Sequence, residues 1–130
     1  MGITMGRFND PEEDLIQATK QAVSESNWSI GESASIWMQR HARGRTDVDF
    51  GLLTGLGGDH VYQCRRVWEA FSDVRSRFAV LKWSHFYAAL NWDDAAENLE
   101  WASDVDATVA EMKAWRRATR GEDLVATSEE

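Results

Sequence analysis

The chain of 130 residues contains one proline and one cysteine and has no long hydrophobic run. The single cysteine, Cys64, excludes an intrachain disulfide, and the sequence lacks the paired Cys or Cys/His spacing of a zinc site. No apolar segment approaches the ~20 residues that span a bilayer, and residues 1–9 lack the basic start and apolar stretch of a signal peptide. We therefore expect a cytoplasmic protein that uses no metal or other cofactor and has no membrane partner.

The scarcity of proline also bears on the fold class. Together with many Ala, Glu, Gln and Arg residues, it favours helices and argues against a sandwich or barrel with many turns. The seven tryptophans are spread along the chain from residue 28 to residue 115, as core anchors would be. The sequence therefore predicts an all-α fold, a compact multi-helix domain of roughly five to seven helices.

Two helix starts are marked near the N-terminus. Asn9, Asp10 and Pro11 precede two glutamates and predict a helix over residues 11–25. This helix has few apolar residues, so we expect it to pack on the side of the domain or on a partner. Ser29 and Glu32 then have the spacing of a capping box, which predicts a separate helix over about 30–42.

Two glycines organise the segment that follows. Helices are expected over about 47–54 and 59–71, with Gly55 between them where the chain turns sharply. Gly51 lies in the middle of the first of these helices, where glycine costs about 1 kcal/mol relative to alanine. We interpret Gly51 as the point where the second helix approaches closely.

This arrangement resembles the helix-turn-helix of bacterial and phage regulators. The match consists of a small residue, a glycine four residues later, and three apolar positions: Gly51, Gly55, Leu56, Val61 and Cys64. It departs from the pattern at Gly57-Gly58-Asp59, where such regulators commonly carry serine or threonine, so contact between the first turn of the second helix and phosphate is in doubt.

The later segments extend the resemblance. Residues 81–90 contain Ser84 and His85, and residues 93–102 are acidic. The last expected helix begins Thr108-Val109-Ala110-Glu111-Met112, in which Thr108 and Glu111 have the spacing of a second capping box. Over about residues 30–120 this order is similar to the DNA-binding region of the ParB and KorB partition and repressor proteins. The resemblance implies a bacterial DNA-binding protein. The nucleotide-binding domain of that family has no counterpart in this sequence, so its CTP-dependent activity is not implied.

Charge is distributed unevenly along the chain. The formal net charge is −8, but residues 1–35, 36–82 and 83–130 carry local balances of −4, +3 and −7. A positive middle between acidic flanks is compatible with a DNA-facing patch that binds weakly and is sensitive to salt.

Helix-turn-helix geometry nominates two sets of residues, because the second helix enters the major groove and the first crosses the backbone. The candidates for base contact face outward from the second helix: Asp59, His60, Tyr62, Gln63 and Arg66. The candidates for phosphate contact are mostly basic: Arg40, Arg43, Arg45, Thr46 and Arg65. In the alternative interpretation Arg65 and Arg66 are ordinary solvated charges and Tyr62 belongs to the edge of the core.

The functional hypothesis is a sequence-specific DNA-binding protein, a nucleoid-associated transcriptional regulator or partition-like factor that binds double-stranded DNA as a homodimer. We divide the chain into an N-terminal helix or arm (1–28), a helical domain (29–120) and a disordered acidic tail (121–130). The alternative is an acidic helical module that binds a protein partner through its flanks. No residue constellation indicates an enzyme, and the three histidines are interpreted as structural.

Overall fold

The structure, a computed structural model, describes residues 9–121. Within this range the protein is all-helical and has no strand, which confirms the predicted fold class. The elements are α2 (Glu12–Arg40), α3 (Asp47–Thr54), α4 (Gly58–Phe71), the 3-10 helix η1 (Arg75–Phe78), α5 (Trp83–Ala88), α6 (Ala95–Val105) and α7 (Val109–Thr119). None of these helices is both long enough and apolar enough to cross a membrane. The predicted acidic tail lies outside the described residues from 122 onward.

The first helix differs from its prediction. The two helices expected over 11–25 and 30–42 are one continuous helix, α2, of 29 residues. The capping box at Ser29 and Glu32 is not used because the chain never leaves the helix before Ser29. Asn27 and Trp28 are buried in the domain instead, so tertiary packing outweighs the local capping signal.

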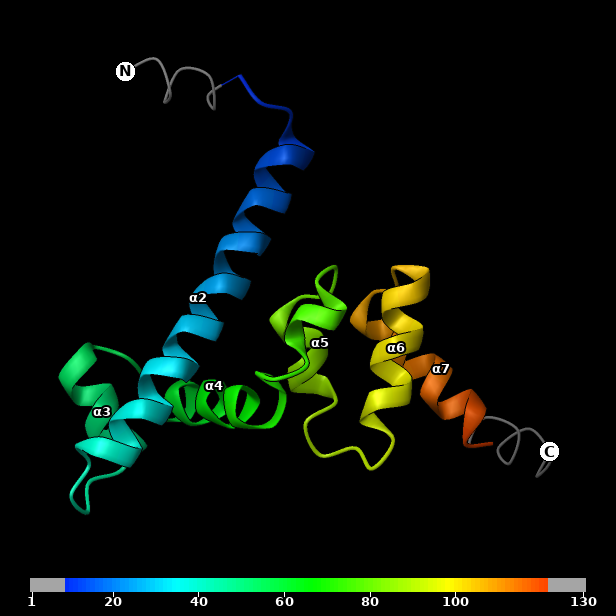
Figure 1. Ribbon diagram of the computed structural model, residues 1–130. Coiled ribbons are helices and arrows are strands. Elements are labelled where there is room, and N and C mark those ends of the chain that lie inside the picture. The colour runs from blue at the N-terminus through cyan, green and yellow to red at the C-terminus, as the bar shows by residue number, and fades with distance from the viewer. Residues whose placement is uncertain (1–8, 122–130) are drawn as a thin grey trace, which may run out of the picture.

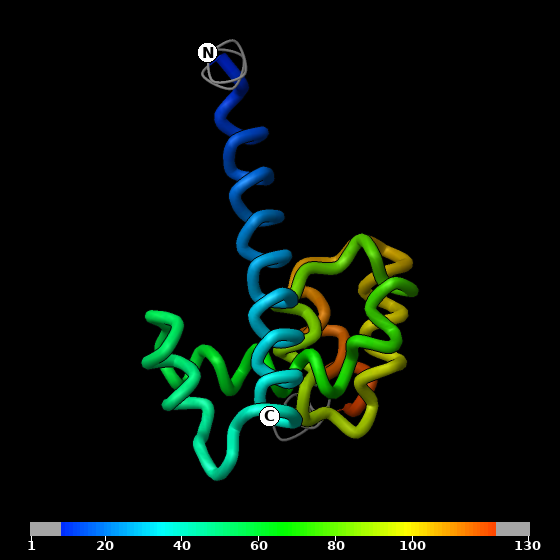
Figure 2. Tube along the Cα trace, turned by 60° about the vertical axis from the view of Figure 1, so that its left-hand side comes forward, coloured from blue at the N-terminus to red at the C-terminus, as the bar shows by residue number. Residues whose placement is uncertain are grey.

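The N-terminal half of α2 stands away from the rest of the domain. Figures 1 and 2 show it as a projecting rod, and we call residues 12–23 the arm. Every residue from 9 to 23 is exposed, and the first buried residue along α2 is Ser24. The arm therefore gains no stability from burial within its own chain.

The second half of α2 crosses α4, and the core lies beside this crossing. Gly31 is buried there, and a Cβ added to it would meet the carbonyl oxygen of Cys64 on α4. Trp28 packs edge-on against Phe86 of α5 with ring centroids 5.1 Å apart. Phe86 also contacts Phe71, at 5.5 Å, so one aromatic cluster joins α2, α4 and α5.

The remaining helices support this core. His85 is buried, and its Nε2 lies 2.8 Å from the carbonyl oxygen of Ala107 while its Nδ1 accepts the backbone N–H of Lys82. This histidine is structural, as predicted. Thr108 caps α7 with the expected reciprocal pair of hydrogen bonds to Glu111. Hydrogen bonds from the backbone N–H and the side chain of Thr108 lower the pKa of the Glu111 carboxyl.

Candidate nucleic-acid interface

Helices α3 and α4 are joined by a tight turn that depends on two glycines. Gly55 ends α3 in the left-handed conformation with φ of 81°, and the N–H of Leu56 donates to the carbonyl oxygen of Gly51 at 2.8 Å. A Cβ on Gly51 would collide with the Leu56 carbonyl oxygen and crowd the backbone nitrogen of Gly58. The predicted roles of both glycines as turn and close-approach residues are confirmed.

The two faces of α4 have different surroundings. One face is buried through Val61, Cys64, Val67 and Phe71. On the outer side, four of the five candidates for base contact line one groove of about 290 Å³. These residues are Asp59, Tyr62, Gln63 and Arg66, and the opposite wall is formed by Tyr87, Leu90 and Asn91. The helical spacing of the outward positions brings these four polar side chains together.

Arg66 and Tyr62 interact within this groove. Nη1 of Arg66 donates to the Tyr62 hydroxyl at 2.8 Å, and the guanidinium carbon lies 5.6 Å from the centre of the tyrosine ring. Tyr62 is 44% exposed, so it does not belong to the edge of the core. The tyrosine orients the arginine, and the guanidinium retains further N–H donors for a ligand.

His60, the fifth candidate, does not line the groove. It is half-buried, and its Nε2 lies 3.7 Å from the Sγ atom of Cys64. Burial raises the pKa of the Cys64 thiol to about 11, so this sulfur is a neutral neighbour.

Arg65 is engaged by two carboxylates. Its Nε and Nη2 atoms donate to Asp47 at 2.8 and 2.7 Å, and Nη1 donates to Glu69 at 3.1 Å. The hydrogen bond with Asp47 raises the pKa of Arg65, although burial opposes this shift. The side chain is only 16% exposed and joins α4 to the start of α3. Arg65 is thus neither a solvated charge nor an unpaired cation available to phosphate.

This pairing predicts a structural role for Arg65. We expect Arg65→Ala to lower the free energy of unfolding by about 1–3 kcal/mol, because the Asp47 carboxylate would be left partly buried without its partner. Arg43→Ala, at an exposed arginine, should change the stability by less than about 0.5 kcal/mol. Urea denaturation of the two variants makes the comparison. Equal stabilities would show that the bidentate pair contributes nothing.

The remaining candidates for phosphate contact lie at the end of α2 and in the link to α3. Arg45 donates to the carbonyl oxygens of His41 and Ala42, and its guanidinium lies 4.8 Å from the centre of the Trp37 ring. Thr46 caps α3 through Asp49. Arg40 and Arg43 are exposed. Arg45 and Arg65 are therefore held by different partners on different elements, whereas the exposed side chains of Arg40 and Arg43 are accessible to an anion.

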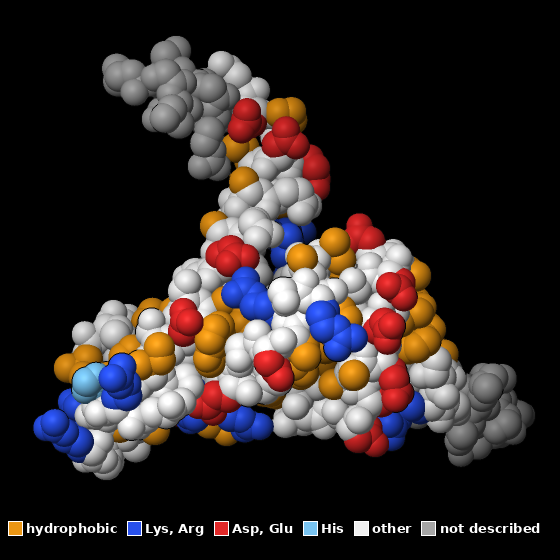
Figure 3. Space-filling model, in the orientation of Figure 1, with side chains coloured by type: hydrophobic (Ala, Val, Ile, Leu, Met, Phe, Trp, Pro, Cys, Tyr) orange, Lys and Arg blue, Asp and Glu red, His pale blue; other side chains and the backbone are white. Residues whose placement is uncertain are grey.

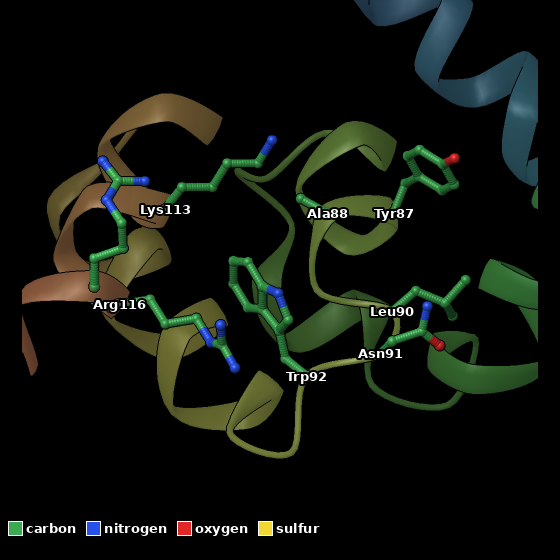
Figure 4. Close-up of a pocket in the computed structure, with 8 residues that line it drawn as sticks. Tyr87, Ala88, Leu90, Asn91, Trp92, Lys113 and Arg116 are labelled. Atoms are coloured by element: carbon green, nitrogen blue, oxygen red, sulfur yellow. The ribbon is translucent and has the colours of Figure 1, made fainter. Parts of the chain in front are cut away.

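The wall opposite α4 was not anticipated from the sequence. Tyr87, Leu90 and Asn91 also line a second groove of about 470 Å³, which reaches α7 (Figure 4). In this view the side chain of Arg116 points toward Trp92, and its guanidinium lies 4.5 Å from the centre of the indole ring. The only sequence signal for this wall is the mixture of aromatic and polar residues that follows His85.

The charge of Arg116 is balanced within the protein. Its Nε donates to Asp94 at 2.8 Å. Burial opposes ionisation of Asp94, but hydrogen bonds from Arg116 and Asn98 lower the pKa of this carboxyl. Arg116 therefore holds Trp92 and Asp94 together in the second groove and adds little net positive charge to it.

Comparison with known proteins does not assign the chain to a family. No model of a known protein family matches the sequence, and neither a curated protein nor a solved structure matches it. The similarity to the ParB and KorB proteins consequently stays a prediction from residues 30–120.

Proposed function

We propose that this protein binds double-stranded DNA in a sequence-specific manner, as a transcriptional regulator or partition-like factor, with α4 in the major groove. The observation that carries the proposal is the gathering of Asp59, Gln63 and Arg66 along one groove within the first nine residues of α4. The tight turn at Gly55 supports it, because it sets α3 across the start of α4.

The chemistry of these side chains suits base edges. Gln63 has the donor and acceptor pair that recognises adenine, Arg66 has the donor pair that recognises guanine, and Asp59 accepts from the amino group of cytosine. Arg40 and Arg43 would contact phosphates. Contacts between basic side chains and phosphates release counterions, so we expect binding to weaken as salt increases. The acidic flanks repel the DNA backbone and keep the non-specific affinity low.

Two copies acting on two half-sites complete the proposal. A single pair of short helices offers few base contacts, and two half-sites about one DNA turn apart supply the missing specificity. The similarity of residues 30–120 to the ParB and KorB proteins supports the same arrangement.

The test is selection from fragmented genomic DNA at low and near-physiological salt. We expect the wild-type protein to enrich one sequence, and we expect Gln63→Ala/Arg66→Ala to weaken binding to it roughly tenfold to a hundredfold, because each base pair contact contributes about 1–3 kcal/mol of discrimination. Gln17→Ala/Arg77→Ala removes the same residue types elsewhere and should leave the enrichment unchanged. Absence of enrichment at both salt concentrations would refute DNA binding.

A protein-binding module is the second candidate, and the outer surface of α3 favours it. Leu52 and Leu53 are 78% and 65% exposed, and Val48 of the same helix is 58% exposed. Exposed apolar side chains on one short helix are typical of a contact surface for another protein. If no DNA is enriched and Leu52→Glu abolishes capture of a purified candidate partner, this second function is supported.

A further inference from the structure

The arm carries an apolar stripe that no part of its own chain covers. Leu15, Ile16 and Val23 are 37%, 41% and 55% exposed. Ile16, Thr19, Val23 and Ser26 recur at spacings of three and four residues, which places them in one row along the helix. Figure 3 shows hydrophobic side chains along one edge of the projecting helix.

The stripe is oriented so that a second helix can reach it. The buried residues of α2, through which it contacts the domain, include Ser24, Asn27, Trp28 and Gly31 next to the arm. By helical geometry this buried row lies about 100° around the axis from the stripe. A helix packed along the stripe would therefore lie beside the domain without displacing it.

Charge along the arm is segregated. The first turn is acidic, with Glu12, Glu13 and Asp14. Basic groups lie where the arm meets the domain: Lys20 on the arm, Lys82, whose Nζ donates to Gln21, and Arg75, which binds Glu25. In Figure 3 the acidic side chains cluster near the tip of the arm and basic side chains lie at its base.

We infer that the arms of two copies of this chain pair in antiparallel orientation along the apolar stripe. Parallel pairing would bring two acidic first turns together, whereas antiparallel pairing sets the acidic tip of each arm against the basic base of the other. Glu13 and Lys20 are about two helical turns apart on one flank of the stripe, so each Glu13 meets Lys20 of the other copy.

The paired surface is short, and this sets the expected affinity. An arm of this length buries less than the about 1,200 Å² typical of stable interfaces, so we expect a dissociation constant on the order of 10 μM or above. The biological role of so weak a dimer rests on the proposed function, because DNA that offers two half-sites stabilises the dimer that binds it. The pairing itself is measured without DNA, so its failure and the failure of DNA binding are separate results.

Sedimentation equilibrium of the full chain tests the pairing. We expect a concentration-dependent dimer that Ile16→Glu/Val23→Glu weakens more than about tenfold, because charges would enter the apolar seam. Val80→Glu/Val105→Glu places the same changes at exposed valines outside the arm, which are 56% and 54% exposed, and should leave the dimer intact. A protein that stays monomeric up to about 1 mM, or a dimer that is indifferent to the arm variant, would overturn the inference.

Two further variants test the orientation. Glu13→Lys and Lys20→Glu should each weaken the dimer about threefold, and the double exchange should restore it, because the ion pair is re-formed with opposite signs. In a second measurement, a bis-maleimide should link Thr19→Cys at the centre of the seam but not Glu12→Cys at its tip. Cys64 does not interfere, because it is buried. Cross-linking of Glu12→Cys alone, or no rescue by the exchange, would contradict antiparallel pairing.

Discussion

Replacement of Gly31 by leucine should lower the free energy of unfolding by about 3 kcal/mol or more, the upper end of overpacking costs. A Cβ at this position meets the Cys64 carbonyl and the Cβ atom of Trp68, so the larger side chain must push α4 away from α2. Helix propensity alone would favour leucine over glycine by about 1 kcal/mol. A decrease in the free energy of unfolding would therefore identify packing, and not helix propensity, as the cause.

The control for this substitution lies two residues away. Ser33 is exposed on α2, so Ser33→Leu should leave the protein as stable as the wild type. Urea denaturation followed by circular dichroism measures both variants, and expression of Gly31→Leu only as an aggregate would agree with the prediction. An unfolding midpoint for Gly31→Leu at or above that of Ser33→Leu would show that the helices do not cross at Gly31.

Gly51→Ser should lower the free energy of unfolding by about 1–3 kcal/mol and weaken the proposed DNA binding more than the loss of stability accounts for. The added Cβ collides with the Leu56 carbonyl oxygen, and this carbonyl belongs to the turn that positions α4. Relief of the collision rotates α4 relative to α3, so the side chains of the groove no longer face one DNA groove together.

The same substitution at Gly57 provides the comparison. Gly57 has no atom within 4 Å of its Cβ position, and it precedes α4 with φ of −70° and ψ of 142°. Serine is a favoured residue at such a cap, so Gly57→Ser should be as stable as the wild type or slightly more stable. Thermal unfolding distinguishes the pair, and equal melting temperatures would contradict the close approach at Gly51.

Local signals predicted the α3–α4 unit well. Gly51 indicates a close approach of the next helix and Gly55 indicates a turn, and both signals lie within about ten residues of the sequence. The capping box of Thr108 and Glu111 was also predicted correctly. The box at Ser29 and Glu32 was misleading, because Trp28 is buried in the aromatic cluster and holds the chain helical through that point.

The partners of the candidate residues could not be predicted. Arg65 binds Asp47, which lies 18 residues earlier, and the wall opposite Gln63 comes from Tyr87 and Asn91. Such contacts depend on how the helices pack, and periodicity within one helix carries no information about them. For this reason the sequence predicted a phosphate contact for Arg65, although the guanidinium of Arg65 stabilises the fold by binding Asp47.

Because α2 is continuous, the number of residues in it fixes both the distance of the arm from the domain and the direction in which the stripe faces. Its 29 residues span roughly 43 Å without a hinge. One residue inserted between the arm and Ser24 would advance everything beyond it by about 1.5 Å and turn it by about 100°, whereas an insertion of three or four residues nearly preserves the direction. In the arm pairing that we infer, the length of this exposed segment is thus constrained in steps of one turn, although its side chains barely touch the rest of the domain.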